Sequence, residues 1–314
     1  MKAGAGARGG QRLCLLEEAL ERRAMGGPFS GPLIADGATG TVLAAMNGGD
    51  YSRLALLPLE KPEYLRSLHR AYLGAGADLI ETATFMADAH SLSQLPGCAG
   101  SAAELAYRCG KAAASVAVDE ARHAEHSLGM RKWVAGSVGP GADTAEAYIP
   151  LIRGLVDGGV DFILIETIQN TARMQAALEA AASGRGGRGI AIALSAAVDS
   201  AGQLCPGTGL REFAASALLW KPLFIGLNCG LGPQSLQKPL TELARLSDLP
   251  LSFMPSAGIP EEASGRPPRW PLDPDAFAEE SAAVIKQTEP AIVGGCCGTT
   301  PMHILRLAAA LKSS

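Results

Sequence analysis

The sequence of 314 residues lacks the features that mark membrane, secreted and nucleic-acid-binding proteins. Gly, Ser or a charged residue interrupts every apolar stretch well before the roughly 18 to 20 residues that a membrane-spanning helix needs. Glu17 and Glu18 interrupt the first apolar stretch, which leaves no core for a signal peptide there. Lys and Arg total 27 against 31 Asp and Glu, so no excess of positive charge favours nucleic acid. We therefore expect a cytoplasmic protein with neither a membrane nor a nucleic-acid partner.

The seven cysteines also lack the pattern of a disulfide framework. Their number is odd, and none falls in a Cys-x-x-Cys motif, so we expect reduced thiols. Their distribution along the chain is uneven. Cys229 follows an apolar run, whereas Cys296 and Cys297 are adjacent in the glycine-rich segment 293–298. These three thiols are the first candidates for chemistry.

Short β-branched and aliphatic runs alternate with longer segments of helical composition along most of the chain. The strand candidates are residues 33–36, 78–82, 133–137, 162–166, 190–195, 223–229, 251–254 and 291–294. Helix candidates lie near residues 62–75, 101–125, 145–158, 170–183, 209–220, 233–247, 273–288 and 301–312. Eight such units predict a single (β/α)8 TIM barrel, whose usual size is about 250 residues. A doubly wound open sheet is the alternative, because buried parallel strands suit both folds.

Two segments divide the chain on this interpretation. Residues 31–314 are predicted to form the barrel, and residues 1–30 a short N-terminal extension with a helix. The amphipathic stretch from Leu13 to Leu20 supplies that helix. We expect it to cap the bottom of the barrel.

Polar or reactive residues follow several of the predicted strands. Asp36 follows the first strand, Glu166 ends the fourth, Cys229 ends the sixth, and Cys296 and Cys297 follow the eighth. The C-terminal strand ends of a TIM barrel share one face and build the active site. An acid at one strand end is more often a helix cap than a catalytic group. The coincidence of acids and thiols on one face nevertheless favours a functional site.

The three thiols fit the ligand count of a catalytic zinc ion, which takes three protein ligands and leaves a fourth position for substrate. Cys229 and Cys296 lie far apart in sequence, but strands six and eight of a closed barrel are only roughly 10 Å apart, at ~4.8 Å per strand. Gly294, Gly295 and Gly298 would let the backbone turn so that neighbouring cysteines face one ion.

Three other interpretations of the thiols stay open at this point. Buried free cysteines serve as small apolar residues in many cores. An adjacent pair could form a strained disulfide, and an iron–sulfur cluster would need a fourth, well-placed cysteine.

Under the zinc interpretation, an electron-rich three-thiolate site suits another thiolate better than a water nucleophile. The substrate is then a thiol, which the metal ionises although a free thiol of pKa about 8.5 is mostly protonated at neutral pH.

Six motifs together resemble the homocysteine S-methyltransferase family, most closely the homocysteine-binding module of cobalamin-dependent methionine synthases. They are Asp36-Gly37-Ala38-Thr39-Gly40-Thr41, Glu81-Thr82-Ala83-Thr84-Phe85, Ser137-Val138-Gly139-Pro140, Ile165-Glu166-Thr167, Gly226-Leu227-Asn228-Cys229 and Gly294-Gly295-Cys296-Cys297-Gly298. The resemblance implies a zinc-dependent enzyme that methylates the thiolate of homocysteine to give methionine. It also implies that Cys229, Cys296 and Cys297 hold Zn²⁺ and carry the catalysis.

The same resemblance implies roles for the residues that bind the substrate. Asp36 and Glu166 would pair with the homocysteine ammonium group, and the amides of Gly37 and Ala38 would hold its carboxylate. Thr84 or its neighbours would line the pocket. Two residues depart from the usual pattern of the branch, which has Asn at both positions. They are Ala83 between the two threonines and Ser256 before Ala-Gly, and the second leaves open whether water or the Ser256 hydroxyl fills the fourth metal position.

The methyl donor is not identified by the sequence. No donor module follows the predicted barrel, so we expect a separate corrinoid protein or methylcobalamin to supply the methyl group. A small donor such as S-methylmethionine or betaine is the enzymatic alternative, and another small thiol or a selenol is an alternative acceptor. A non-catalytic zinc- or thiol-binding accessory barrel is the alternative from another class.

Overall fold

The protein is described from a computed structural model that covers residues 16–20, 31–184, 190–204, 207–261 and 268–312. Eight parallel strands form one sheet in the order β1-β10-β9-β8-β5-β4-β3-β2. A parallel bridge between Ala35 and Leu79 joins the strands at the two ends of that order, β1 and β2. The sheet is therefore a closed barrel, and the predicted (β/α)8 fold is confirmed in preference to the open sheet.

The barrel strands agree with the runs that the sequence analysis selected. They are β1 (Leu33–Ile34), β2 (Leu79–Glu81), β3 (Trp133–Val138), β4 (Phe162–Ile168), β5 (Ala191–Ala196), β8 (Ile225–Asn228), β9 (Leu251–Met254) and β10 (Ile292–Val293). Most are buried along their whole length, as expected for parallel strands covered by helices on one face and packed into a barrel on the other. A two-stranded hairpin, β6 (Gln203–Leu204) and β7 (Thr208–Gly209), is inserted after β5.

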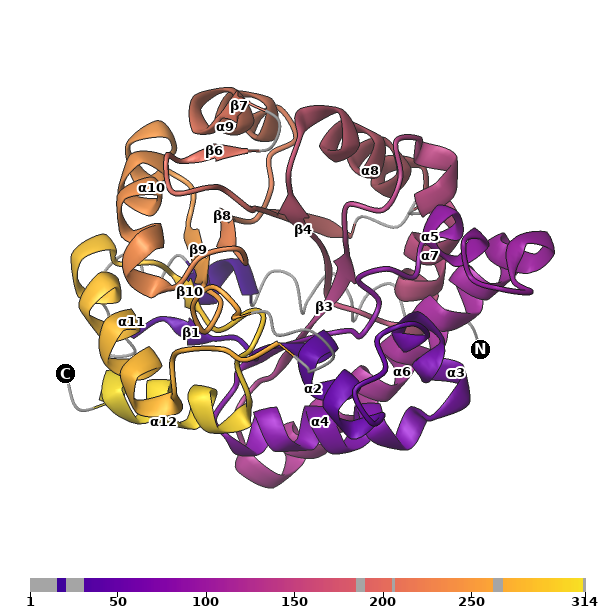
Figure 1. Cartoon of the computed structure of the whole chain (residues 1–314), viewed down its shortest axis with the longest axis horizontal. Coiled ribbons are helices and arrows are strands. Elements are labelled where there is room, and N and C mark those ends of the chain that lie inside the picture. Colours follow the sequence, from indigo (N-terminus) through magenta and orange to yellow (C-terminus); the bar gives the residue numbers. More distant parts are fainter. Residues whose placement is uncertain (1–15, 21–30, 185–189, 205–206, 262–267, 313–314) are drawn as a thin grey trace.

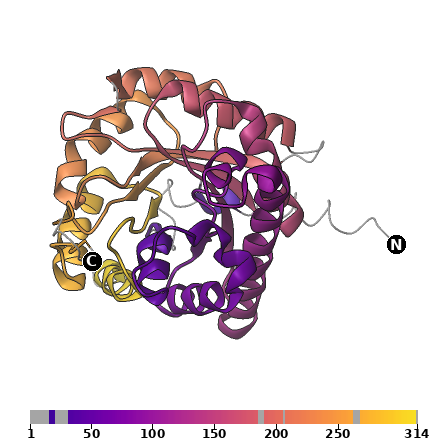
Figure 2. The ribbon, with the colours of Figure 1, turned by 45° about the vertical axis from the view of Figure 1, so that its right-hand side comes forward.

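Helices surround the strands on the outside (Figures 1 and 2). The longer ones are α4 (Pro62–Gly74), α6 (Ala102–Leu128), α7 (Ala145–Gly158), α8 (Thr171–Gly184), α9 (Leu210–Leu218), α10 (Pro233–Leu246), α11 (Pro274–Thr288) and α12 (Pro301–Lys312). Short elements fill the first two connections: α2 (Thr39–Met46), η1 (Leu54–Leu56), α3 (Leu57–Glu60), α5 (Ala89–Ser93) and η2 (Ala99–Ser101). These short elements lie between a strand end and the next long helix, so they build up one side of the barrel's C-terminal face.

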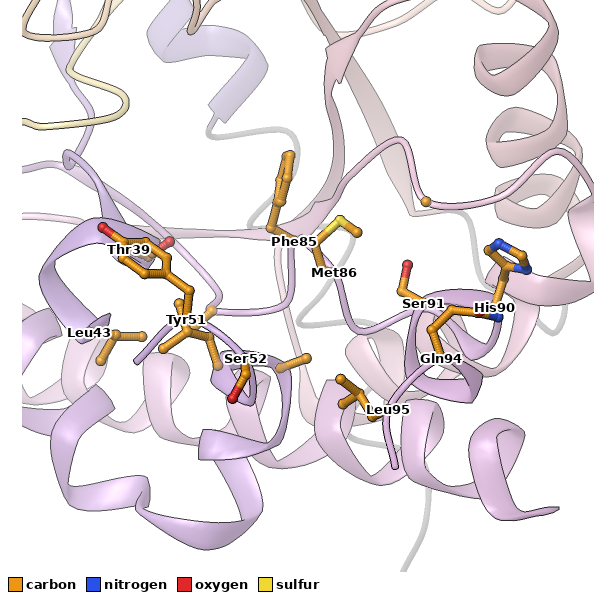
Figure 3. A pocket seen from close by; sticks show the side chains of 15 residues that line it. Thr39, Leu43, Tyr51, Ser52, Phe85, Met86, His90, Ser91, Gln94 and Leu95 are labelled. Carbon is orange, nitrogen blue, oxygen red and sulfur yellow. The ribbon is translucent and has the colours of Figure 1, made fainter. Parts of the chain in front are cut away.

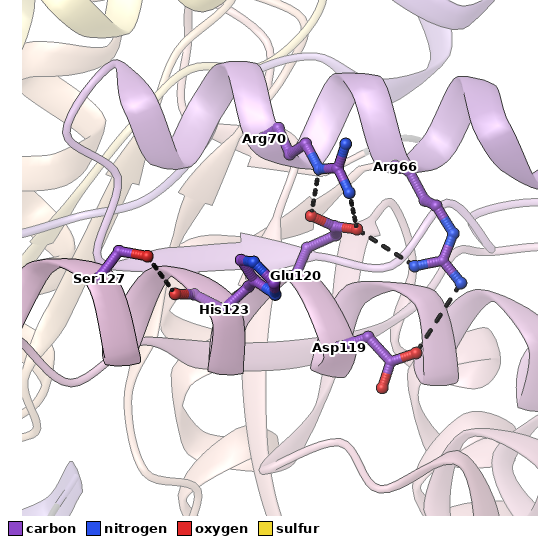
Figure 4. A network of polar contacts seen from close by, with 6 residues as sticks. All are labelled: Arg66, Arg70, Asp119, Glu120, His123 and Ser127. Carbon is purple, nitrogen blue, oxygen red and sulfur yellow. Dashed lines mark hydrogen bonds and ion pairs between the residues drawn. The ribbon is translucent and has the colours of Figure 1, made fainter.

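An ion-pair network on the outside joins α4 to α6 (Figure 4). Glu120 of α6 is only 4% exposed, and it accepts hydrogen bonds from Arg70 Nε at 2.6 Å and from Arg66 Nη1 at 3.1 Å. A carboxylate buried to this degree needs such partners, because an unpaired buried charge is strongly destabilising. The network fixes α4 against α6 away from the strand ends that carry the candidate site.

The N-terminal ends of the strands are sealed by apolar side chains. Residues 16–20 are helical, and Leu16 and Leu20 are buried in one cluster with Trp133, Phe162 and Phe224 from the beginnings of β3, β4 and the run before β8. The segment expected to cap the barrel bottom thus does so where it is described. The rest of the predicted extension, residues 1–15 and 21–30, lies outside the described residues.

Within the described ranges, no helix is both long enough and apolar enough to cross a membrane.

Candidate active site

The three predicted thiols come together at the C-terminal end of the barrel. The Sγ atoms of Cys229, Cys296 and Cys297 all lie within 4.8 Å of one another, and those of Cys229 and Cys297 are 3.5 Å apart. In the described part of the chain they form the one cluster of histidine, cysteine or acidic residues with ligand atoms close enough for a metal ion. All three are free thiols and partly exposed, so the interpretations as a disulfide or as inert core residues do not hold.

The spacing of the sulfur atoms fits a single tetrahedral metal ion. Zinc–sulfur bonds of about 2.3 Å at tetrahedral angles place neighbouring sulfurs about 3.8 Å apart. Soft thiolate ligands select zinc over magnesium or calcium, which prefer oxygen. The donor set and the spacing therefore fit a zinc ion that these three cysteines would hold.

Two turns of unusual backbone geometry aim the sulfurs at one point. Cys229 directly follows β8 with φ of 62°, a left-handed conformation that non-glycine residues rarely adopt. Gly298 has φ of 79°, and a Cβ at this residue would lie 2.1 Å from the Trp270 ring. The predicted need for glycine beside the paired cysteines is thus explained at Gly298, where both the backbone conformation and the close approach of Trp270 require it.

The thiols polarise one another. Contacts with the Cys296 and Cys297 side chains lower the pKa of Cys229 to about 3, because they stabilise the Cys229 thiolate. The same contacts raise the pKa of Cys296 and Cys297, whose own ionisation would add a second charge beside the first. Ser256 Oγ also donates to Cys229 Sγ at 3.9 Å. Ser256, one of the two residues that depart from the usual pattern of the branch that the sequence resembles, thus contacts a sulfur of the cluster.

A chain of hydrogen bonds connects the turn that carries the paired cysteines to the loop after β9. His303 Nδ1 accepts from the Thr300 amide at 3.2 Å, so Nε2 carries the proton and donates to Leu272 O at 3.1 Å. The Leu272 amide donates to Ala257 O, and the Ala257 amide donates to Cys297 O, at 3.1 and 2.9 Å. His303 therefore connects the segment that carries Cys296 and Cys297 to the loop after β9 and stabilises both.

Three buried carboxyl groups lie beside the sulfurs. Asp36 is fully buried, and Glu81 and Glu166 are each 7% exposed. Burial raises the pKa of Asp36 and Glu81 well above the usual range and that of Glu166 to about 7. Glu81 is hydrogen-bonded to Glu166, while Asp36 Oδ1 and Glu81 Oε1 have no partner. No basic side chain in the described ranges forms an ion pair with these groups. The arrangement suits a cationic group of a ligand.

Asn228, which directly precedes Cys229, contacts the carboxyl group of Glu166 and the turn at Thr167. Its side-chain oxygen accepts from the Thr167 amide at 3.0 Å and from Ser195 Oγ at 2.8 Å. Its amide nitrogen contacts Thr167 Oγ1 at 2.8 Å and Glu166 Oε2 at 3.2 Å. Thr167 has φ of 55°, which is unfavourable for a β-branched residue. The Asn228 side chain stabilises this strained turn and so orients the Glu166 carboxyl group, which Ser137 Oγ also contacts.

The sequence analysis missed Glu81 and Asn228 as site residues. Both had a recognisable signal, because each is the last residue of a barrel strand and each lies inside a motif already singled out. A single polar residue at a strand end has an ordinary explanation as a cap. Only the positions of neighbouring strands show that these two face the thiols.

The remaining predicted residues lie near the pocket but use some of their polar groups internally. Gly37 and Ala38 line it, together with the start of α2. The Ala38 amide donates to Thr299 Oγ1 at 3.0 Å. Thr84 is buried, and its hydroxyl donates to Ser137 O at 2.7 Å. Phe85, the neighbour of Thr84 in the chain, lines the cavity beside the cysteines. The volume of this cavity is about 110 Å³.

A larger pocket adjoins this cavity between the connections that follow β1 and β2 (Figure 3). Its volume is about 500 Å³, and it shares Thr39, Gly40 and Phe85 with the cysteine pocket. Burial raises the pKa of Tyr51 on its wall. The two hollows thus adjoin along these three shared residues.

The barrel, the three thiols and the buried carboxyl groups belong to a chain that matches one known protein family. The profile of the homocysteine S-methyltransferase family matches residues 33–311. The chain belongs to this family. The family match includes both strand ends that carry the cysteines. It also includes all three buried carboxyl groups.

Relatives within the family include two longer proteins. The methionine synthases of Mycobacterium leprae and Mycobacterium tuberculosis are 34% identical to it over 301 and 303 residues, or 89% and 90% of the chain. The chain spans about a quarter of their length, 24% and 25%.

A solved structure supports the same family. The oxidized form of the homocysteine methyltransferase MmuM from Escherichia coli matches with a TM-score of 0.73 at 25% identity, covering 88% of this chain and 95% of that one. Its metallated form matches with a TM-score of 0.71 at 26% identity, covering 92% and 99%.

Proposed function

We propose that the protein is a zinc-dependent S-methyltransferase that transfers a methyl group to the thiolate of homocysteine and forms methionine. The observation that carries this proposal is the three-sulfur cluster beside three buried carboxyl groups, two of which have unpartnered oxygens. The cluster suits a thiol, and the carboxyl groups suit an amine. Homocysteine has both a thiol and an amine. The relatives of this chain include a protein whose name describes the methylation of homocysteine.

Cys229, Cys296 and Cys297 would hold the zinc ion. A zinc ion bound by three thiolates takes up a further thiol as thiolate at neutral pH, which makes that sulfur a nucleophile. The fit of the sulfur spacing to a tetrahedral ion supports this assignment. A reduced trio also favours a cytoplasmic location, where thiols remain reduced.

The chain's own residues would orient the amino-acid portion of the substrate. The ammonium group would pair with Asp36 and Glu166; Glu166 lines the cavity, and Asp36 Oδ1 is buried without a hydrogen-bond partner. The carboxylate would lie against the backbone of Gly37 and Ala38 at the start of α2, where the helix dipole favours an anion. Thr84 would act through its bond to Ser137, behind the pocket wall.

The reaction would form one bond and break one. The homocysteine sulfur attacks the methyl carbon of the donor, and the electron pair of the broken bond stays with the donor's leaving atom. The donor would be methylcobalamin or a separate methylated corrinoid protein. Positioning of the sulfur in line with the methyl group is the main contribution that the protein can make.

Zinc analysis combined with methionine formation tests this function. Purified protein should contain about one zinc per chain and should convert homocysteine to methionine with methylcobalamin. S-methylmethionine, betaine and methylfolate, each offered separately, test the alternative donors. Other small thiols and a selenol test the acceptor. Bound zinc without methionine from any donor would contradict the proposal and indicate a non-catalytic accessory barrel.

A further inference from the structure

Two backbone segments at the C-terminal end of the barrel contact each other directly. The first, residues 36–41 after β1, carries Asp36 and begins α2. We call it the amino-acid turn, because the proposed function places the ammonium and carboxylate groups of homocysteine there. The second, residues 294–299 after β10, carries Cys296 and Cys297, and we call it the metal turn. The two ends of the proposed substrate would thus lie on two different turns.

One buried hydroxyl group links these turns. Thr299 is fully buried, and its Oγ1 accepts a hydrogen bond from the Ala38 amide at 3.0 Å. The same oxygen donates to Cys296 O at 2.7 Å. A hydroxyl can donate and accept at the same time, so both bonds form together. The Ala38 amide of one turn and the Cys296 carbonyl of the other therefore bind the same atom.

The two turns approach this hydroxyl closely because both present a glycine to it. A Cβ at Gly37 or at Gly295 would lie 2.5 Å from Thr299 Oγ1, which is too close for a real contact. Glycine at both residues therefore permits the approach. On the other side, the Tyr72 hydroxyl donates to Ala38 O at 2.9 Å. Both backbone polar groups of Ala38 are thus held by buried side chains.

The Thr299 link differs from the other contacts between the turns. Two further hydrogen bonds join them, from the Gly295 amide to Asp36 O at 3.0 Å and from the Gly298 amide to Thr41 Oγ1 at 3.3 Å. The first of these continues the parallel pairing of β1 with β10. The Thr299 hydroxyl instead joins the carbonyl of a proposed zinc ligand, Cys296, to a backbone amide expected beside the substrate carboxylate, that of Ala38.

We propose that Thr299 is a positioning residue that couples the two ends of the substrate site, so that an amino acid bound to the amino-acid turn tightens the hold of the metal turn on zinc. This inference rests on the proposed function and adds a role for a residue that acts through Ala38 and Cys296. A ligand that orders the Ala38 backbone also orders Cys296 through the shared hydroxyl, and an ordered ligand set binds its ion more tightly. The coupling is reciprocal, so bound zinc also tightens the binding of the amino acid.

The experiment measures how fast zinc leaves the protein for a coloured chelator in the presence of an amino acid without sulfur. L-2-aminobutyrate has the ammonium and carboxylate groups of homocysteine but no thiol, so it cannot retain zinc as a thiolate ligand would. D-2-aminobutyrate controls for weak binding of zinc by free amino acids. Thr299→Val removes the hydroxyl, and Thr299→Ser keeps it. Thr288→Val is the matched control, because it removes a hydroxyl that donates to Val284 O at the end of α11.

In the unmodified chain, L-2-aminobutyrate should slow zinc loss about fivefold or more, which is the lower end of ordinary coupling between sites. D-2-aminobutyrate should have no such effect. Thr299→Ser and Thr288→Val should keep this protection, whereas Thr299→Val should reduce it to about twofold or less. Equal protection in Thr299→Val and in the unmodified chain would overturn the proposal. So would the absence of protection in the unmodified chain, a result that does not depend on whether Thr299→Val folds.

Failure of the proposed function would give a different result. Methionine formation, with equal zinc protection in all the variants, would support the methyltransferase and overturn the role of Thr299. Zinc protection that depends on the Thr299 hydroxyl, without methionine from any donor, would contradict the catalytic proposal and support the coupling.

Discussion

The two ends of the barrel are built from the same eight strands but differ in almost every physical property. At the N-terminal end, Trp133, Phe162 and Phe224 pack with Leu16 and Leu20 into a closed apolar cluster. The C-terminal end carries partly exposed thiols and carboxyl oxygens without partners. The N-terminal end packs apolar side chains against one another, although Trp133 Nε1 has no hydrogen-bond partner, whereas the C-terminal end keeps thiols and carboxyl oxygens for a ligand.

Backbone strain occurs at both ends of the barrel. Among the described residues, Thr167 and Cys229 have positive φ beside the site, and Lys221 and Glu289 have positive φ in the connections before β8 and β10. Such conformations cost about 1–3 kcal/mol each and persist where the surroundings hold them. Asn228 and the hydrogen bonds around it supply that support at Thr167.

The largest effect is expected from a substitution of a proposed metal ligand at the C-terminal end of the barrel. Cys229→Ser should reduce zinc affinity and methionine formation by on the order of 10²-fold or more, because a hydroxyl is a poor substitute for a thiolate. Cys98→Ser is the matched control, since Cys98 is a free thiol outside the cluster. Zinc analysis and turnover are measured on both. Full activity in a metal-free Cys229→Ser protein would contradict the proposed role of the trio.

The next effect concerns the buried carboxyl groups. Asp36→Asn should raise the KM for homocysteine about 10- to 100-fold with zinc retained, because the ammonium group loses a charged acceptor. Glu81→Gln should have a smaller effect, since its amide can still donate to Glu166 as the protonated acid does. Loss of zinc from Asp36→Asn would show that this residue supports the metal turn instead of the substrate.

A weaker effect is expected where the site is supported from behind. His303→Phe keeps a ring against Phe277 but removes the hydrogen bonds to Thr300 and Leu272. Zinc affinity should fall about tenfold, which is the scale for groups that position a metal ligand. Competition with a chelator measures this affinity without reference to turnover. Unchanged affinity would mean that the other bonds of the turn are sufficient.

The smallest effect on activity should come from the sealed end. Phe224→Leu removes an edge-to-face contact with Phe162, whose ring centroids are 5.7 Å apart. The free energy of unfolding should fall by about 1 kcal/mol or somewhat more. The KM for homocysteine and the zinc content should remain unchanged in the folded protein. Denaturant titration and kinetics together check both statements, and a large change in KM would contradict the separation of the two ends.

The strand and helix pattern was predictable because it depends on local periodicity. The predicted helix near 145–158 coincides with α7, and the one near 62–75 with α4. The short elements after β1 and β2 were missed. Their apolar residues line the larger pocket and the barrel's outer side in no single period, so local reasoning could not separate them from loops.

The candidate site was predictable only in part. The thiol trio followed from residue type, since three cysteines at strand ends have few ordinary explanations. The roles of Asn228 and Glu81 did not follow, because their importance depends on contacts with other strands, as between Asn228 and Glu166. The Ala38 amide, expected to face the substrate, contacts Thr299 from the far end of the chain.

The sequence by itself determined the alternation of strands and helices, the number of barrel strands and the residue types at their C-terminal ends. These properties depend on neighbours along the chain, so they can be inferred from the order of residues alone. The tertiary structure decided the distances between the sulfurs, the strained turns that aim them and the larger pocket beside them. Those properties depend on strands and loops that are far apart in sequence, and only closure of the barrel brings them together.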